Sequence, residues 1–239
     1  MKFPKSIDRK VRLPRLWSNN ELGKFASLFR GDVVNVSAWK DSDKDGKNYE
    51  EYFVNAKNYW ITNHQTREKG FDPTLKNQIS LDLELPLPKN LKGRFDVVFN
   101  HTTLEHVFEC KTAFSNLCQM TSDVVILVVP FIQHQHAAYG DYWRFTPDCI
   151  NELFLKNDMR LVYISFNDGP NQAVYIFAIG TKEPKKWKKI EEHIDNKISS
   201  LKEKVGFEVV NQSLFYKLNE LSKFVFLVFT AVLGKIKRF

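Results

Sequence analysis

The sequence has little cysteine and no apolar run long enough to cross a membrane. Its 239 residues include 3 cysteines, an odd number without C-x-x-C spacing, which fits neither a disulfide framework nor a zinc knuckle. The most apolar stretch of the tail, residues 224–234, is too short for about 30 Å of hydrocarbon. The basic residues 1–17 precede no apolar core, so a secretory signal is not expected. These absences favour a protein of the reducing cytoplasm.

Basic charge is concentrated at one end of the chain. Of the net +7, residues 1–181 contribute +1 (22 Lys and Arg against 21 Asp and Glu) and residues 182–239 contribute +6 (13 against 7). A nearly neutral body lacks the broad phosphate-binding face of a nucleic-acid protein. Internal repeats and low-complexity tracts are absent as well. Nucleic acid is therefore not expected as a partner.

Strand and helix signals alternate along the body, which predicts an α/β fold. Residues 95–100 and 122–131 are near-continuous apolar runs, typical of strands covered on both faces. The segment between them has apolar residues at helical spacing, so the three together predict a βαβ unit. Shorter runs predict three further strands, at residues 32–38, 58–62 and 78–83.

The next helix has a clear start signal. Thr146 is placed to cap it, Pro147 occupies its first position, and Asp148 falls in the electropositive first turn. Two apolar runs around a Gly-Pro turn at residues 167–172 then predict a β-hairpin. Together these elements predict a mainly parallel sheet with one antiparallel strand. Such sheets bind ligands beyond the carboxyl ends of their strands.

Three separated motifs resemble the class I S-adenosylmethionine-dependent methyltransferases. They are FDVVFNHTTLEHV at residues 95–107, VPF at 129–131 and GDYWRFTP at 140–147, within a resemblance that covers roughly residues 28–182. The members that look most similar are small bacterial proteins that accompany cell-envelope polysaccharide genes. The resemblance implies a Rossmann-like sheet of order 3-2-1-4-5-7-6 with strand 7 antiparallel. It also implies S-adenosyl-L-methionine as the cofactor.

The first half departs from the family pattern where the cofactor would bind. Asn35 and Ser37 stand in place of an acidic residue and a glycine-rich turn after strand 1, and Trp39 follows. Glycine suits that turn because it has no Cβ to obstruct the ligand. At the end of strand 2, uncharged Asn63 stands where an acid normally accepts the ribose hydroxyls, whereas Asp82 matches the acid found near the adenine. The resemblance places these residues at the cofactor: Asn35, Ser37, Asn63, Asp82, Leu83, Asn100 and His101.

Histidines and a charged loop follow the fourth and fifth strands. A sugar hydroxyl needs a general base, and histidine, with a pKa near 6.5, suits that task. His106 or His136 is therefore predicted to take the proton. Asp141 is predicted to orient that histidine or a substrate hydroxyl, and Arg144 to bind an acidic or phosphate group of the acceptor. The alternative for Glu105 and His106 is that they only cap and solvate the following helix.

No metal site is predicted. His134 and His136 have H-x-H spacing and lie near Asp141, but the set lacks a further ligand. Some family members that methylate quinone precursors bind a metal through an E-x-x-E-H motif after strand 4. That motif is incomplete here, because its first position is Thr102.

The chain divides into three predicted parts: an N-terminal helical lead-in at 1–27, a methyltransferase-like domain at 28–182, and basic and amphipathic helices at 183–239. Within residues 212–239, apolar residues recur three and four apart, with lysines on both sides. That pattern suits packing on the domain, homodimerisation and peripheral contact with the inner membrane equally well.

The prediction for function is a methyltransferase that O-methylates a sugar, a nucleotide sugar or a lipid-linked glycan. The glycan rests on the resemblance alone. The alternative is a methyltransferase-like binding or scaffold protein that has lost catalysis, for which Ser37, Trp39 and Asn63 are the evidence. A nucleic-acid methyltransferase is disfavoured, because NHTT stands after strand 4 in place of an N-P-P-Y type motif.

Overall fold

The computed structural model describes most of the predicted domain. The described residues are 12–65, 70–136, 140–167 and 174–191, together with 218, 221 and 222. Most of the turn predicted at 167–172 and nearly all of the tail predicted at 212–239 lie outside them. The roles of that tail and the division into three parts therefore stay predictions. Among the residues that the structure describes, no helix has the length and apolar character needed to pass through a membrane.

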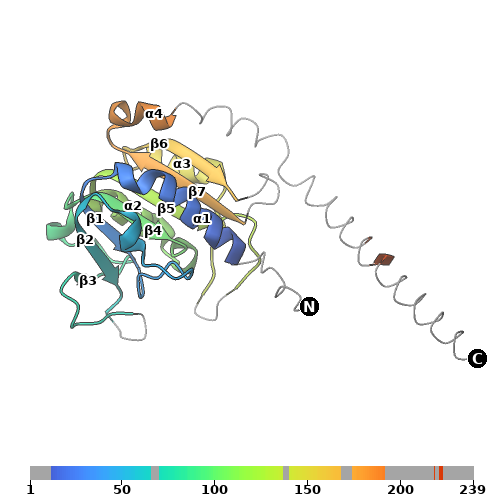
Figure 1. The fold of residues 1–239 in the computed structure, drawn as a ribbon, viewed down its shortest axis with the longest axis horizontal. Helices are drawn as coiled ribbons and strands as arrows, with labels where there is room; N and C mark the ends of the chain where they lie inside the picture. The colour runs from blue at the N-terminus through green and yellow to red at the C-terminus, as the bar shows by residue number, and fades with distance from the viewer. Residues whose placement is uncertain are drawn as a thin grey trace, which may run out of the picture.

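A seven-stranded sheet of order β3-β2-β1-β4-β5-β7-β6 forms the centre of the molecule (Figure 1). The strands from β3 to β5 pair in parallel, and β7 runs antiparallel to both of its neighbours. The predicted strand order and the antiparallel seventh strand are thus confirmed. The strands are β1 Gly31–Val36, β2 Ala56–Asn63, β3 Gln78–Ser80, β4 Phe95–His101, β5 Thr121–Pro130, β6 Arg160–Phe166 and β7 Tyr175–Thr181.

Helices cover both faces of the sheet, with α1 lying across one of them (Figure 1). α2 (Cys110–Met120) and α3 (Pro147–Leu155) pack on the opposite face. α1 (Arg12–Phe25) continues into the 3₁₀ helix η1 (Ala26–Leu28). After β7, the 3₁₀ helix η6 and the short α4 complete the described body, at Pro184–Trp187 and Lys188–Glu191.

Successive residues of β4 and β5 face opposite cores. Val98 and Leu127 lie in the core beneath α2 and α3, whereas Val97 and Ile126 lie in the core beneath α1. Because side chains alternate between the two faces of a strand, a strand covered on both sides needs apolar residues at every position. This explains why these two segments read as continuous apolar runs.

The loops at the carboxyl edge of the sheet differ more from the sequence predictions than the strands do. α3 begins as predicted, with Thr146 Oγ1 accepting a hydrogen bond from the Cys149 N–H at 3.1 Å. After β4, however, the 3₁₀ helix η5 (Leu104–His106) precedes α2. The connection from β1 to β2, at residues 37–55, contains the 3₁₀ helix η2 (Tyr49–Tyr52) and no α-helix. Among the predicted site residues, Ser37 and His106 lie in these irregular segments.

Candidate active site

Four parallel strands deliver polar residues to one edge of the sheet. β1, β2, β4 and β5 end at Val36, Asn63, His101 and Pro130, and parallel strands end at the same edge. The predicted cofactor residues lie at the ends of β1 to β4, and the predicted catalytic residues follow β4 and β5. The structure therefore brings both sets to the edge where sheets of this kind bind ligands.

The loop after β1 contains left-handed residues that are not glycine, and its first glycine is Gly46. Ser37, Trp39 and Asp41 have φ angles of 58°, 54° and 56°, in the left-handed region. Each such conformation costs a residue with a Cβ roughly 1 kcal/mol or more, and it persists only where other contacts enforce it. At the start of the loop, the Ser37 N–H donates to Thr62 Oγ1 at 3.1 Å. The left-handed conformations that glycine usually adopts are thus held here by contacts with other residues.

Asn63, at the end of β2, enforces the conformation of Trp39. Its Oδ1 accepts a hydrogen bond from the Trp39 N–H at 2.7 Å, and its Nδ2 donates to the Trp39 and Gly70 carbonyls at 2.8 and 3.0 Å. A carboxylate has no hydrogen for these two donations. Asn63 is also buried. The amide that replaces the family's acid therefore holds the loop, and in this arrangement it does not face a ribose.

Asn35 and Asp41 form a buried polar network beneath the same loop. Asp41 Oδ1 accepts hydrogen bonds from Asn35 Nδ2 at 2.8 Å and from the Tyr59 hydroxyl at 2.6 Å. Its Oδ2 accepts the Glu50 N–H at 3.0 Å. Burial raises the pKa of Asp41 more than these hydrogen bonds lower it. Asn35 consequently supports the loop from inside the core.

Asn100 and His101 connect the end of β4 to its neighbours. Asn100 Nδ2 donates to the Val36 carbonyl at 2.9 Å, and its buried Oδ1 has no partner among the described residues. His101 Nε2 lies 2.8 Å from Ser18 Oγ, which gives its own hydrogen to the Arg15 carbonyl at 2.8 Å. Nε2 must then be the donor, which assigns Nδ1 as the acceptor. Burial lowers the pKa of His101 well below its ordinary value, so the ring is neutral.

Arg15, on α1, is a site residue that the sequence analysis missed. Its guanidinium donates to the Tyr49 hydroxyl and to Thr102 Oγ1, both at 3.2 Å, and lies 3.4 Å from His101 Nδ1. Among the ion pairs of the described residues, none includes Arg15. Nothing in the local sequence marks this residue, because its place depends on how α1 packs across the sheet. The structure thus adds a cation at the carboxyl edge that has no ion-pair partner among the described residues.

Asp82 and Leu83 follow β3. Asp82 Oδ2 lies 3.5 Å from His64 Nε2, and Oδ1 accepts the Glu84 N–H at 2.9 Å. Leu83 is buried, and its carbonyl accepts a hydrogen bond from Asn116 at 3.0 Å. The Asp82 side chain keeps 29% of its surface exposed. Its carboxylate therefore remains accessible to a ligand.

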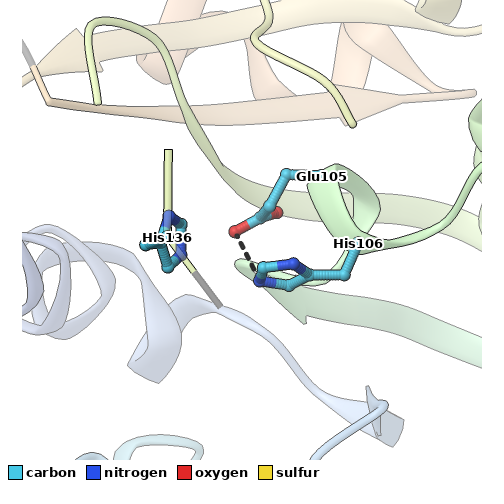
Figure 2. Close-up of side chains that lie close together, drawn as sticks. All are labelled: Glu105, His106 and His136. Atoms are coloured by element: carbon cyan, nitrogen blue, oxygen red, sulfur yellow. Dashed lines mark ion pairs between the residues drawn. The ribbon is translucent and has the colours of Figure 1, made fainter. Parts of the chain in front are cut away.

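Glu105, His106 and His136 form a cluster between the ends of β4 and β5 (Figure 2). Glu105 is completely buried, and neither of its carboxylate oxygens has a hydrogen-bond partner in the described part of the chain. Burial raises the pKa of this carboxyl to about 8. Capping and solvating the following helix was one alternative for Glu105, whereas in the structure its side chain is buried.

The two histidines of this cluster are held by the loop that follows β5. His106 Nδ1 lies 2.6 Å from the Gly140 carbonyl, to which it must donate, and Nε2 lies 3.7 Å from Glu105 Oε1. Its ring centroid lies 5.2 Å from that of His136. Burial lowers the pKa of His106, so the neutral ring is favoured. His106 and His136 are thus brought together, as the prediction of a shared catalytic site requires.

Asp141 and Arg144 fix that loop. Both amino groups of Arg144 donate to the Asp141 carboxylate, at 2.5 and 2.7 Å. The remaining N–H donors bind, at 2.7, 2.7 and 3.0 Å, the carbonyls of Gln133, Trp143 and His134. These hydrogen bonds from Arg144 hold the pKa of Asp141 at about 2.

The role predicted for Arg144 stays a prediction. A guanidinium has five N–H donors, and all of them are used inside the loop, so an acidic group of the acceptor would have to replace one of these contacts. Asp141 accepts the His136 N–H at 2.6 Å, and its Oδ2 lies 3.2 Å from His136 Nδ1. That Asp141 orients a catalytic histidine stays a prediction.

The sheet order, the antiparallel β7 and the ligand edge define the class I methyltransferase fold. The magnesium protoporphyrin IX methyltransferase of Synechocystis PCC 6803, solved with S-adenosylhomocysteine, is similar with a TM-score of 0.52 over 76% of this chain and 90% of that one, at 10% identity. An S-adenosylmethionine-dependent methyltransferase of Clostridium acetobutylicum has a TM-score of 0.50 over 73% and 92%, also at 10% identity. These likenesses establish the fold. No protein-family model matches the sequence, and no curated protein is significantly similar to it.

Proposed function

We propose that the protein is an S-adenosylmethionine-dependent methyltransferase that methylates a hydroxyl of a sugar, a nucleotide sugar or a lipid-linked glycan. The observation that carries the proposal is the carboxyl edge of this sheet, where the loop after β1, Asp82 and the Glu105–His106–His136 cluster meet. The Synechocystis protein of the same fold was solved with the demethylated cofactor. The sugar or glycan acceptor is supported by the sequence motifs alone.

The residues at this edge suit the methionyl part and the adenine of the cofactor better than they suit the ribose between them. The guanidinium of Arg15, which has no ion pair within the described part of the chain, suits the carboxylate of the methionyl part. The buried Asn100 Oδ1, which lacks a partner there too, is an acceptor to which a ligand could donate a hydrogen bond. Asp82 suits the amino group of adenine, as the family resemblance implies. Asn63 offers the ribose no charge, so we expect affinity to depend on Arg15 and Asp82.

Methyl transfer from a sulfonium needs positioning more than covalent help from the protein. The bound cofactor supplies the methyl group, and the acceptor oxygen has to lie about 3 Å from it. The protein must also remove the hydroxyl proton. His106 presents Nε2 as its acceptor nitrogen because Nδ1 donates to Gly140, and His136 lies beside it. We propose that His106 or His136 accepts the hydroxyl proton, and that Asp141 positions His136.

The test is transfer of a labelled methyl group to a panel of nucleotide sugars and glycan lipids. Replacing both histidines, as His106→Ala with His136→Ala, is expected to lower kcat by about 10²–10⁴-fold, the usual contribution of a general base. His134→Ala, at an exposed histidine of the same loop, is the matched control and should leave kcat unchanged. Methyl transfer that survives the double substitution would remove the assignment of the base.

A binding or scaffold protein without catalysis is the second candidate. The specific observation in its favour is Asn63, whose amide is committed to Trp39 and Gly70 in place of a ribose. This candidate predicts that the protein binds neither S-adenosylmethionine nor S-adenosylhomocysteine. Calorimetry with both compounds separates the two candidates directly.

A further inference from the structure

We propose that Glu105, His106 and His136 bind a divalent first-row transition-metal ion. One ligand atom from each residue lies within 4.8 Å of the other two, and Figure 2 shows the three side chains gathered around one point. Two imidazoles with one carboxylate form a ligand set that suits Zn²⁺ and related ions. Binding of the ion stands independently of the proposed methyl transfer, whereas its use in catalysis rests on that proposed function.

The isolation of Glu105 is the strongest argument for an ion. Its side chain has 0% exposure, and neither carboxylate oxygen has a hydrogen-bond partner within the described residues. Buried carboxylates are nearly always paired, hydrogen-bonded or bound to a metal. Arg144, the cation of the adjoining loop, is already held by Asp141 through both amino groups. A metal ion would supply the positive partner that the Glu105 carboxylate lacks among the described residues.

His106 is oriented as a metal ligand usually is, and His136 lies beside a carboxylate without a hydrogen bond from its ring within the described residues. A ligating imidazole typically has its second nitrogen fixed by a carbonyl or a carboxylate. His106 Nδ1 is placed at 2.6 Å from the Gly140 carbonyl, and the ring of His136 approaches Asp141 Oδ2 at 3.2 Å. The hydrogen bond to Gly140 thus limits rotation of the His106 ring in the absence of an ion.

Only a small closure separates this cluster from a bound geometry. Ligand atoms in a tetrahedral zinc site, with bonds of about 2.1 Å, lie about 3.4 Å apart. Glu105 and His106 already approach this separation at 3.7 Å. The ligands come from η5 and from the loop after β5, so no strand has to move. The third ligand is His136, which distinguishes the set from the E-x-x-E-H motif that Thr102 interrupts.

An ion with three protein ligands keeps at least one position for another ligand. In the proposed reaction that position suits the acceptor hydroxyl, whose pKa a bound ion would lower. His106 and His136 would then act as ligands, the ion would stabilise the negative oxygen that forms, and the hydroxyl proton would pass to solvent water. The double histidine substitution lowers activity under either account, so binding of the ion has to be measured separately.

The experiment is calorimetric titration with Zn²⁺ of the full chain, carrying a tag without histidine and stripped by a chelator. We expect one ion per chain. Glu105→Gln and His136→Ala should each weaken binding by at least about tenfold, the minimum loss seen when even an outer-shell partner is removed. His134→Ala is the control and should bind as the unaltered protein does.

The melting temperature provides a second readout for the same variants. Zn²⁺ should raise the melting temperature of the unaltered protein and of His134→Ala, but not the melting temperature of Glu105→Gln. The amide of this variant keeps the size of the buried side chain. Absence of Zn²⁺ binding, or binding that Glu105→Gln and His136→Ala leave intact, would overturn the site. Parallel titration with S-adenosylhomocysteine distinguishes failure of this inference from failure of the proposed function.

Discussion

Ser37 holds a left-handed conformation, with φ of 58°, without the freedom of glycine. Ser37→Gly should therefore raise the free energy of unfolding, by about 0.5–1 kcal/mol, because it removes the crowding of the Cβ. The matched control is Ser80→Gly in β3, where no left-handed backbone is present and glycine should lower stability by a similar amount. Urea denaturation measures both. A loss of stability on Ser37→Gly would contradict the assignment of strain to this loop.

His101 makes stability depend on pH, because it is buried and neutral. Its pKa in the folded chain is well below its ordinary value of 6.5, so at lower pH the unfolded chain binds a proton that the folded chain does not. The stabilisation is complete above about pH 6.5 and is lost as pH falls, by up to about 1.4 kcal/mol per pH unit.

His101→Gln removes this titration while it retains a polar group opposite Ser18. The unaltered protein should lose more free energy of unfolding between pH 7 and pH 5 than the variant does. Urea unfolding at several pH values provides the comparison. If the free energy of unfolding falls equally in the two proteins, His101 has the same pKa in the folded and the unfolded chain, which contradicts this assignment.

At the scale of elements, the loop after β5 is fixed by an ion pair more than by apolar packing. Arg144→Met would leave the Asp141 side chain, which has 0% exposure, without its cation. Breaking a buried pair in this way should lower the free energy of unfolding by about 3 kcal/mol. Amide exchange should also quicken at residues 133–136 and 140–144.

The control for this loop is the exposed pair of Lys156 and Glu152 on α3. Lys156→Met should change the free energy of unfolding by no more than about 0.5 kcal/mol, because surface pairs contribute little. If both methionine variants behave alike, the loop owes its position to other contacts.

Elements with strong local signals were predictable, and those that depend on distant partners were not. β4 and β5 could be read from the sequence because burial on both faces requires apolar residues throughout. α3 could be read from its cap at Thr146. The path of residues 37–41 could not, because Asn63 of another strand enforces it. α1 was expected only as a helical lead-in, and its packing is what brings Arg15 to the site.

At the scale of the whole molecule, sequence reasoning indicated that the candidate residues share one edge of the sheet, but it did not show which of them hold the loops. Parallel strands end at one edge, so the candidates were bound to meet there. Asn35, Asn63 and Arg144 proved to be committed to internal hydrogen bonds. Glu105, for which capping was one open alternative, proved to be a buried carboxyl group without a hydrogen-bond partner among the described residues. Whether a polar group already has its hydrogen-bond partners depends on three-dimensional packing, which a local sequence pattern does not show.

The claim on which this account depends is that the carboxyl edge of the sheet binds S-adenosylmethionine. Calorimetric titration of the full chain with S-adenosylhomocysteine tests it most directly. The account predicts one molecule bound per chain, with affinity lowered by about tenfold or more, or about 1.4 kcal/mol, in Arg15→Ala. Lys24→Ala, on the same helix, should bind as the unaltered protein does. A folded protein that binds neither S-adenosylhomocysteine nor S-adenosylmethionine would contradict the account and leave the scaffold function in its place.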